Sequence, residues 1–327
     1  MVNKYSNNAI VLLARYPDNV WLNFLNNFYD YDIFVVIDDN NHDFCKLFEK
    51  ANSKINFIQI NDDYCKKGGY YNSLIKTGNV PDKVLSWDKA LFYFCLINTY
   101  YDNVWFIEDD VFFLSENVIK NIDNHYPTSD LLTALNEMNH NGNCNGHETG
   151  WPHWHCVNNK MSLPWAKSMV CMCRLSNRLL NDVKKYVDNN KILVYHEIMF
   201  NTLAYQNNYK IDTPNELSRI QYNTSWDIHN LDINYCYHPL KNIQDHNLLR
   251  QWNMIYFNNL FNDINYSLVE KFYFDEYDFL RKHLPEGFNF CCYRENNKLC
   301  YLADLSDNSV IWDWFNYGKY ENKKYKD

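Results

Sequence analysis

The stretch VWFIEDDVFF, residues 104–113, decides the fold. It opens with an apolar run, continues with the acidic residues Glu108, Asp109 and Asp110, and closes with further apolar residues. A continuous apolar run of this length predicts a strand that is buried on both faces. Because apolar residues lie on both sides of the acidic ones, we expect the carboxylates to be fixed at the end of that strand.

Strand-like and helix-like segments alternate on the N-terminal side of this stretch. Apolar runs predict strands over 9–14 and 33–37 and an edge strand over 55–60, whereas helical spacing predicts helices over 20–28 and from Ser86 onward. This alternation predicts an α/β fold, a mostly parallel sheet flanked by helices. Ligands bind beyond the carboxyl ends of the strands in such sheets, and three of the four predicted strands end in acidic or Asn clusters.

The C-terminal side continues the pattern and then changes. Strands are predicted over 168–175 and 192–195, each followed by a helix, over 179–187 and 198–205. We assign residues 1–242 to this main domain. Residues 243–327 are predicted to form an α+β appendage packed on it, with a helical stripe over 273–284 and a hairpin from 288–293 and 299–302.

The segment 136–165 breaks the periodicity and has two interpretations. It holds three of the eight glycines, which favours a lid that closes over a bound ligand and stacks Trp151 and Trp154 against it. The alternative is a zinc site built from Cys144, His147, His153, His155 and Cys156.

Composition limits the partners and the compartment. The formal net charge of −9 argues against a broad nucleic-acid surface. The longest apolar run before the acidic cluster is far shorter than the roughly 20 residues that span a bilayer, so no membrane span is predicted. No secretory signal is evident and the eleven cysteines contain no Cys-x-x-Cys, so we expect a cytoplasmic protein with reduced thiols.

The acidic cluster has the character of a metal site. Glu108 and Asp110 are two residues apart, so the pleat of a strand sends both side chains to the same side. Adjacent carboxylates repel one another unless a cation is present, and hard cations such as Mn²⁺ or Mg²⁺ prefer oxygen ligands. The alternative is a solvated strand end that holds no metal.

With this motif closing a central strand, residues 8–241 resemble the GT-A superfamily of glycosyltransferases, whose signature is an acid-x-acid motif at that place. Glu108 departs from the signature, because Asp is commoner there. The resemblance implies a metal-dependent enzyme of the hexosyltransferase class. It would move a sugar from a nucleotide-sugar donor, a UDP-sugar, to a hydroxyl of a glycan, protein or small-molecule acceptor.

Two other functions fit the same carboxylates. One is a metal-dependent nucleotidyltransferase or hydrolase, although the turn after the first strand, residues 15–18, lacks the glycines of a phosphate loop. The other is a catalytically inactive carbohydrate-binding relative.

The resemblance also implies roles for residues outside the acidic segment. His238 would be a further metal ligand beside Glu108 and Asp110. The donor would be bound by residues at strand ends, at a helix start and near His238, namely Ala14, Arg15, Tyr16, Asp38, Asp39, Asp88, Lys89, Asp109 and Lys241. For Arg15 the alternative is a surface charge, for Asp38 and Asp39 a turn or cap, and for Asp88 and Lys89 a solvated helix start.

Glu197 is the candidate general base, with His196 beside it. It opens a predicted helix, where the helix dipole stabilises a carboxylate facing the crevice of the sheet. An inverting transfer needs a base that takes the proton of the acceptor hydroxyl. The alternative is a favourable charge in the first turn of a helix.

Overall fold

The computed structural model describes residues 7–48, 54–72, 84–227, 231–259, 281, 284–297, 307, 310–311, 314 and 325–326. The chain forms two compact units. One comprises Met1–Pro17 with Trp21–Leu240, and the other comprises Asp18–Val20 with Lys241–Asp327.

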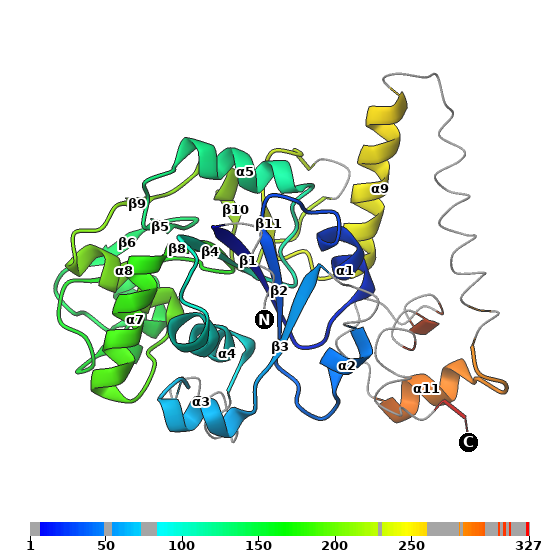
Figure 1. Cartoon of the computed structure of the whole chain (residues 1–327), viewed down its shortest axis with the longest axis horizontal. Helices are drawn as coiled ribbons and strands as arrows, with labels where there is room; N and C mark the ends of the chain where they lie inside the picture. Colours follow the sequence, from blue (N-terminus) through cyan, green and yellow to red (C-terminus); the bar gives the residue numbers. More distant parts are fainter. Residues whose placement is uncertain are drawn as a thin grey trace. The chain divides into compact units, whose positions relative to one another are not determined.

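A mixed seven-stranded sheet forms the centre of the first unit (Figure 1). Neighbouring strands follow the order β3 (Ile55–Gln59), β2 (Asp32–Ile37), β1 (Asn8–Ala14), β4 (Asn103–Glu108), β8 (Met172–Ser176), β5 (Leu131–Leu132) and β9 (Ile211–Asp212). Strands β3, β2, β1 and β4 are parallel, and β8 runs antiparallel to both of its neighbours. The predicted α/β architecture with a mostly parallel sheet is therefore confirmed, and β3 is an edge strand as expected.

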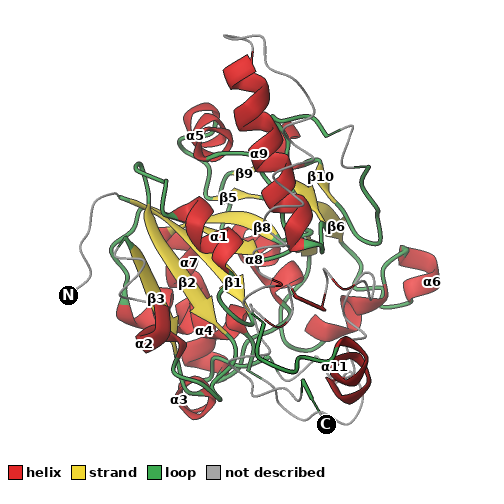
Figure 2. Cartoon of the chain, turned by 90° about the vertical axis from the view of Figure 1, so that its right-hand side faces the viewer, coloured by secondary structure: helices red, strands yellow, loops and turns green. Residues whose placement is uncertain are grey.

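Helices cover both faces of this sheet (Figure 2). On one face, alternate strand residues such as Phe34 and Phe106 share a core with α4 (Ser86–Phe92), α7 (Asn177–Asn190) and α8 (His196–Gln206). On the other face, Asp123 of α5 (Glu116–His125) accepts hydrogen bonds from Trp105 of β4 and Arg174 of β8. The sheet is thus buried on both sides, which leaves strand ends as the places for polar chemistry.

Several short elements lie between residues 19 and 238. They are α1 (Asn19–Leu25), α2 (Phe44–Phe48), α3 (Asp62–Gly68), a π-helical turn (Tyr93–Ile97), β6 (Glu137–Asn139), α6 (Gly146–Thr149), two 3₁₀ turns (Pro152–Val157 and Asn215–Leu217), β7 (Trp165–Lys167), β10 (Arg219–Ile220) and β11 (Tyr237–His238). Strand β6 pairs with β7, and β10 pairs with β11.

Two predicted strands are wrong in detail. Of the segment 168–175 only the part from Met172 onward is a strand, β8, because the Ser168 amide donates to the Glu197 carbonyl and the chain is out of the ladder there. The segment 192–195 makes only a single bridge, between Leu193 and Asn72. Leu193 and Val194 are buried, and burial with little strand pairing explains the misleading pattern.

The second unit contains α9 (Ile243–Asn259) and α11 (Phe290–Asn297). The first half of the predicted hairpin is therefore wrong. The Asn289 side chain accepts from the Cys292 amide and caps a helix, while Phe288 and Tyr293 pack with Trp314 and Tyr325. Residues 273–280 and 299–302, which carry the rest of these two predictions, lie outside the described residues.

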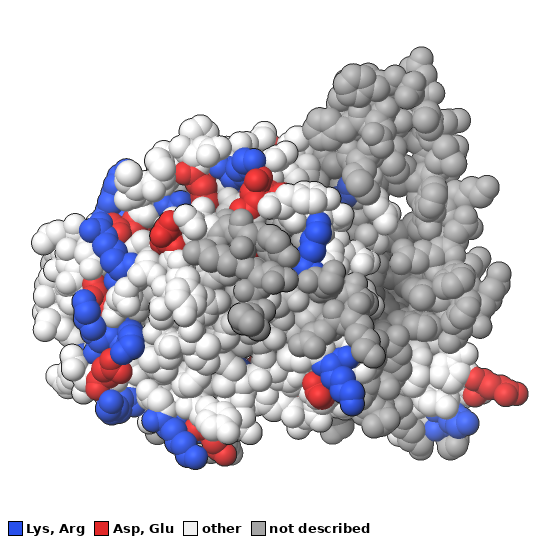
Figure 3. All heavy atoms as spheres, in the orientation of Figure 1, with Lys and Arg blue, Asp and Glu red and all other residues white. Residues whose placement is uncertain are grey.

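The described surface gives two further findings. No helix within the described ranges is long and apolar enough to cross a membrane. On the face shown in Figure 3, the described Lys and Arg side chains lie interspersed with Asp and Glu rather than gathered into one basic surface.

Candidate functional site

The acidic cluster lies where β4 ends. Glu108 is the last residue of the strand, and the Val111 amide donates to its carbonyl across a tight turn that contains Asp109 and Asp110. The indole of Trp21 donates to the Asp109 carbonyl at 2.8 Å, which ties this turn down. Glu108 and Asp110 are half-buried, whereas Asp109 is exposed.

A distant part of the chain brings His238 to this turn. Phe112 and Tyr237 exchange both backbone hydrogen bonds, at 2.9 and 2.8 Å, and the Leu240 amide donates to the Asp110 carbonyl at 2.7 Å. As a result, His238 Nε2 lies 3.4 Å from Asp110 Oδ1 and 4.0 Å from Glu108 Oε2. The structure therefore brings together the three predicted metal ligands.

Neighbouring groups orient two of these side chains. Trp87 Nε1 donates to Glu108 Oε1 at 2.7 Å, which leaves Oε2 directed at His238. His238 Nδ1 lies 2.8 Å from the Gln221 carbonyl, which can only accept, so Nδ1 carries a proton and Nε2 faces the carboxylates. Metal-binding histidines are commonly held in this way, with the second nitrogen donating to a carbonyl.

The converging atoms require positive charge between them. Two carboxylate oxygens and an imidazole nitrogen repel one another unless a proton or a cation is shared. Burial lowers the pKa of His238, but the hydrogen bond and charge of Asp110 outweigh burial and raise it. The pKa of Glu108 is also raised, in this case by burial. Protons and a metal ion would therefore compete for the same place.

Cys171 is a neighbour that the sequence did not single out. One oxygen of Glu108, the Cys171 sulfur and one nitrogen of His238 all lie within 4.8 Å of one another. Within the described ranges this is the only such group of three or more His, Cys, Asp or Glu. The zinc alternative in 136–165 is thus not supported, and Trp154 of that segment is buried against Trp165 instead of facing a sugar.

Glu197 lies in the first turn of α8, where the charges of Glu108 and His238 affect its pKa. Burial is the main cause that raises its pKa to about 7, and the nearby charge of Glu108 acts in the same direction. A hydrogen bond from Tyr195 and the charges of Lys167 and His238 oppose the rise. A carboxyl group with this pKa exchanges protons readily near neutral pH.

His196 packs against Trp87, the residue that orients Glu108. Its ring stacks on Trp87 with centroids 4.7 Å apart, and burial lowers its pKa to about 3. It is therefore neutral at neutral pH and packs against the indole that orients Glu108. Helical spacing predicted Trp87 only as a core residue, because periodicity indicates burial but not the direction of an indole N–H.

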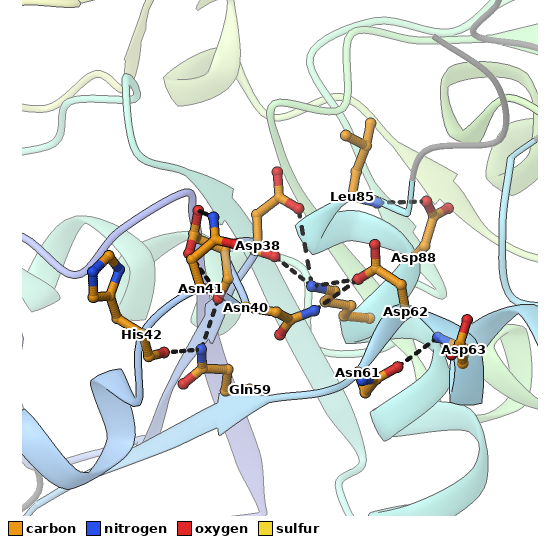
Figure 4. Close-up of polar contacts among 12 residues, drawn as sticks. Asp38, Asn40, Asn41, His42, Gln59, Asn61, Asp62, Asp63, Leu85 and Asp88 are labelled. Atoms are coloured by element: carbon orange, nitrogen blue, oxygen red, sulfur yellow. Dashed lines mark hydrogen bonds and ion pairs between the residues drawn. The ribbon is translucent and has the colours of Figure 1, made fainter. Parts of the chain in front are cut away.

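A second acidic cluster lies at the ends of β2 and β3 (Figure 4). The Lys89 side chain is completely buried, and its ammonium group bonds the Asp38 carbonyl and lies 3.0 Å from Asp62 Oδ1. It also lies 4.0 Å from Asp38 Oδ1. Lys89 therefore holds these strand ends together, and its burial contradicts the alternative of a solvated helix start.

The remaining predicted donor residues have local partners. Asp88 accepts from the Leu85 amide at 2.8 Å and caps α4, and burial raises its pKa to about 7. Asp39 accepts from the Asn41 amide at 2.7 Å, as in a turn. The turn alternative is thus supported for Asp39, whereas Asp88 is a buried cap and not the solvated helix start of its alternative.

Three residues follow or close β1. Ala14 is its buried last residue, and its carbonyl accepts from the Asp38 amide at 2.9 Å. The exposed Arg15 lies over the ring of Tyr16, at 4.8 Å from its centroid, and Tyr16 packs on Phe44. Lys241 is exposed and belongs to the second unit.

A cavity of about 280 Å³ lies beside β11. Trp226, which lines it, donates from its indole to the His238 carbonyl at 3.1 Å. Its lining combines aromatic rings with charged groups: Arg219, Trp226, Asp227, Leu231, Asp232, Tyr235 and Tyr237.

No protein-family model matches the sequence, and no curated protein matches it. Among solved structures, the chain is similar to the mannosyltransferase Ktr4p from S. cerevisiae, with 12% identity and a TM-score of 0.33 over 61% of this chain and 65% of that one. It thus spans less than two thirds of that protein. It is also similar to mouse xyloside xylosyltransferase 1 in its apo form, with 9% identity and a TM-score of 0.31 over 64% of this chain and 85% of that one. At these values the similarities carry no argument about activity.

Proposed function

We propose that this chain is a metal-dependent glycosyltransferase that uses a nucleotide-diphosphate sugar. One observation carries the proposal. Glu108 Oε2, Asp110 Oδ1 and His238 Nε2 converge at the carboxyl end of a central strand, where a cation would relieve their repulsion. The resemblance of the sequence to the GT-A superfamily supports the choice of transfer over other metal chemistry.

Glu108, Asp110 and His238 would hold the ion, Mn²⁺ or Mg²⁺. Two carboxylates and a neutral imidazole suit a manganese-like ion. When bound, such an ion supplies positive charge that stabilises a departing diphosphate. Trp87 and the Gln221 carbonyl keep the side chains of Glu108 and His238 in place, so that little reorganisation is needed when the ion enters.

Glu197 would act as the base. With a pKa near 7 it can take the proton of an acceptor hydroxyl as the oxygen attacks the anomeric carbon, so the proton goes to the Glu197 carboxyl. The bond from Tyr195 orients this carboxyl. We therefore propose an inverting transfer, with a uridine donor whose nucleoside lies toward Tyr16 and Asp38.

The first experiment measures thermal unfolding with UDP, GDP, ADP and CDP, each with and without Mn²⁺. One nucleotide should raise Tm only in the presence of metal. At a concentration 100 times Kd the added stability is about 2.7 kcal/mol. Equal stabilisation without metal, or none with any nucleotide, would contradict the proposal.

The Glu197→Gln variant tests the base. It should lose transfer while keeping the metal-dependent rise in Tm, because the amide cannot accept the proton. Glu116→Gln is the matched control, since Glu116 also lies in the first turn of a helix, on the opposite face of the sheet. Normal turnover of Glu197→Gln would remove Glu197 from the mechanism.

A further inference from the structure

We propose that Cys171 is a sulfur ligand of the cation site, which makes it a mixed oxygen, nitrogen and sulfur site that prefers Zn²⁺ and Co²⁺ to Mg²⁺. This inference rests on the proposed function, because it concerns the same cation. It adds a ligand that the acid-x-acid signature does not contain.

The distances suit a shared ion. The ligand atoms of Glu108, Cys171 and His238 lie within 4.8 Å of one another. Around a tetrahedral ion, a metal–sulfur bond of about 2.3 Å and a metal–nitrogen bond of about 2.1 Å place the two ligand atoms about 3.6 Å apart. Side-chain movements of about 1 Å would therefore bring all three atoms onto one ion, with Asp110 beside His238 as the fourth ligand.

The backbone fixes Cys171 against the strand that carries the acids. The Glu108 amide donates to the Cys171 carbonyl at 2.8 Å, immediately before β8 begins its antiparallel pairing with β4. Cys171 is only 6% exposed, so its thiol cannot turn away into solvent.

The surroundings of the thiol are unusual for a structural cysteine. Cys173, two residues later, is fully buried in the apolar core shared with α4, α7 and α8. Cys171 does not belong to that core, and its thiol hydrogen-bonds to the Glu108 side chain and faces the charges of Glu197 and Asp110. A buried thiol among carboxylates is in the position of a ligand rather than a packing group.

The chemistry determines which ions the site selects. Thiolate is a soft ligand that suits Zn²⁺ and Co²⁺, whereas Mg²⁺ prefers an octahedron of oxygens. When the ion binds, the metal–sulfur bond replaces the S–H bond of Cys171 and the proton passes to water.

The test is a titration of the full chain with Co²⁺, monitored by absorption spectroscopy. We expect a sulfur-to-cobalt charge-transfer band in the near ultraviolet, together with visible bands of bound Co²⁺. The band should be absent from Cys171→Ser and present in Cys144→Ser, a control at a half-buried cysteine outside the site. Cys171→Ser should also lower the preference for Zn²⁺ over Mg²⁺ by tenfold or more.

The outcomes separate this inference from the proposed function. Visible bands without a charge-transfer band in the wild-type chain would overturn the role of Cys171 and leave the cation site intact. Retention of the band by Cys171→Ser would have the same meaning. No binding of Co²⁺ at all would overturn both the sulfur ligand and the cation site. If Cys171→Ser folds poorly, Cys171→Ala is the second variant, and a wild-type spectrum without the band overturns the role of Cys171 in either case.

Discussion

Two acidic clusters lie at the carboxyl ends of one sheet, and they differ in the source of their positive charge. At the ends of β2 and β3, the buried Lys89 neutralises Asp38 and Asp62 from within the chain. At the end of β4, no Lys or Arg of the described part of the chain forms an ion pair with Glu108 or Asp110, and their ion-pair partner is His238. The first cluster is complete when the chain folds, whereas the second needs an ion or a proton from solution.

Replacing Lys89, the internal cation of the first cluster, should cause the largest change, a loss of stability. Lys89→Met removes the buried positive charge that lies beside Asp38 and Asp62, so we expect the free energy of unfolding to fall by about 3 kcal/mol. Urea denaturation followed by circular dichroism measures it, and Mn²⁺ should not restore the loss. Lys120→Met, which removes an ion pair exposed at the surface, is the control and should stay close to wild type. Equal stabilities of the two variants would show that Lys89 does not compensate this cluster.

Removing an acid from the cluster at the end of β4 should reduce activity rather than stability. Asp110→Asn should lower kcat/KM of transfer about 100-fold, or about 2.7 kcal/mol, and abolish the rise in Tm with Mn²⁺. Without metal its Tm should not fall, because the change relieves repulsion with Glu108. Asp62→Asn, in the cluster at the ends of β2 and β3, should show the reverse: lower stability and an intact response to Mn²⁺. If Asp110→Asn keeps the rise in Tm with Mn²⁺, the acids at the end of β4 do not need Asp110 to bind the ion, and the contrast between the two clusters is contradicted.

The smallest expected effect concerns the indole behind Glu108. Trp87→Phe removes the donor to Glu108 Oε1, so the ligand loses its fixed orientation and metal affinity should fall about tenfold. Calorimetric titration with Mn²⁺ measures this change. Trp105→Phe is the matched control, since its indole bonds Asp123 on the opposite face of the sheet, and it should leave the affinity unchanged. If both variants bind alike, Trp87 contributes packing only.

The local pattern predicted the elements that are buried along their whole length. The runs at 9–14, 33–37 and 104–107 became β1, β2 and β4 because an apolar run of strand length has one stable solution in an α/β sheet. It failed where burial arises without strand pairing, as at 192–195, and at 288–293, where Asn289 caps a helix. In both places apolar residues were buried by tertiary contacts that their spacing does not encode.

The sequence by itself determined that three acids close a buried strand, since apolar residues and turn chemistry act over a few neighbouring positions. Only the tertiary structure decided what those acids face. The pairing of Phe112 with Tyr237 delivers His238 to Asp110, and the start of β8 places Cys171 beside Glu108. Likewise, only the packing of α4 against β2 gives Asp38 its internal cation. The physical reason is that electrostatic compensation depends on distance in space, and residues far apart along the chain supply it.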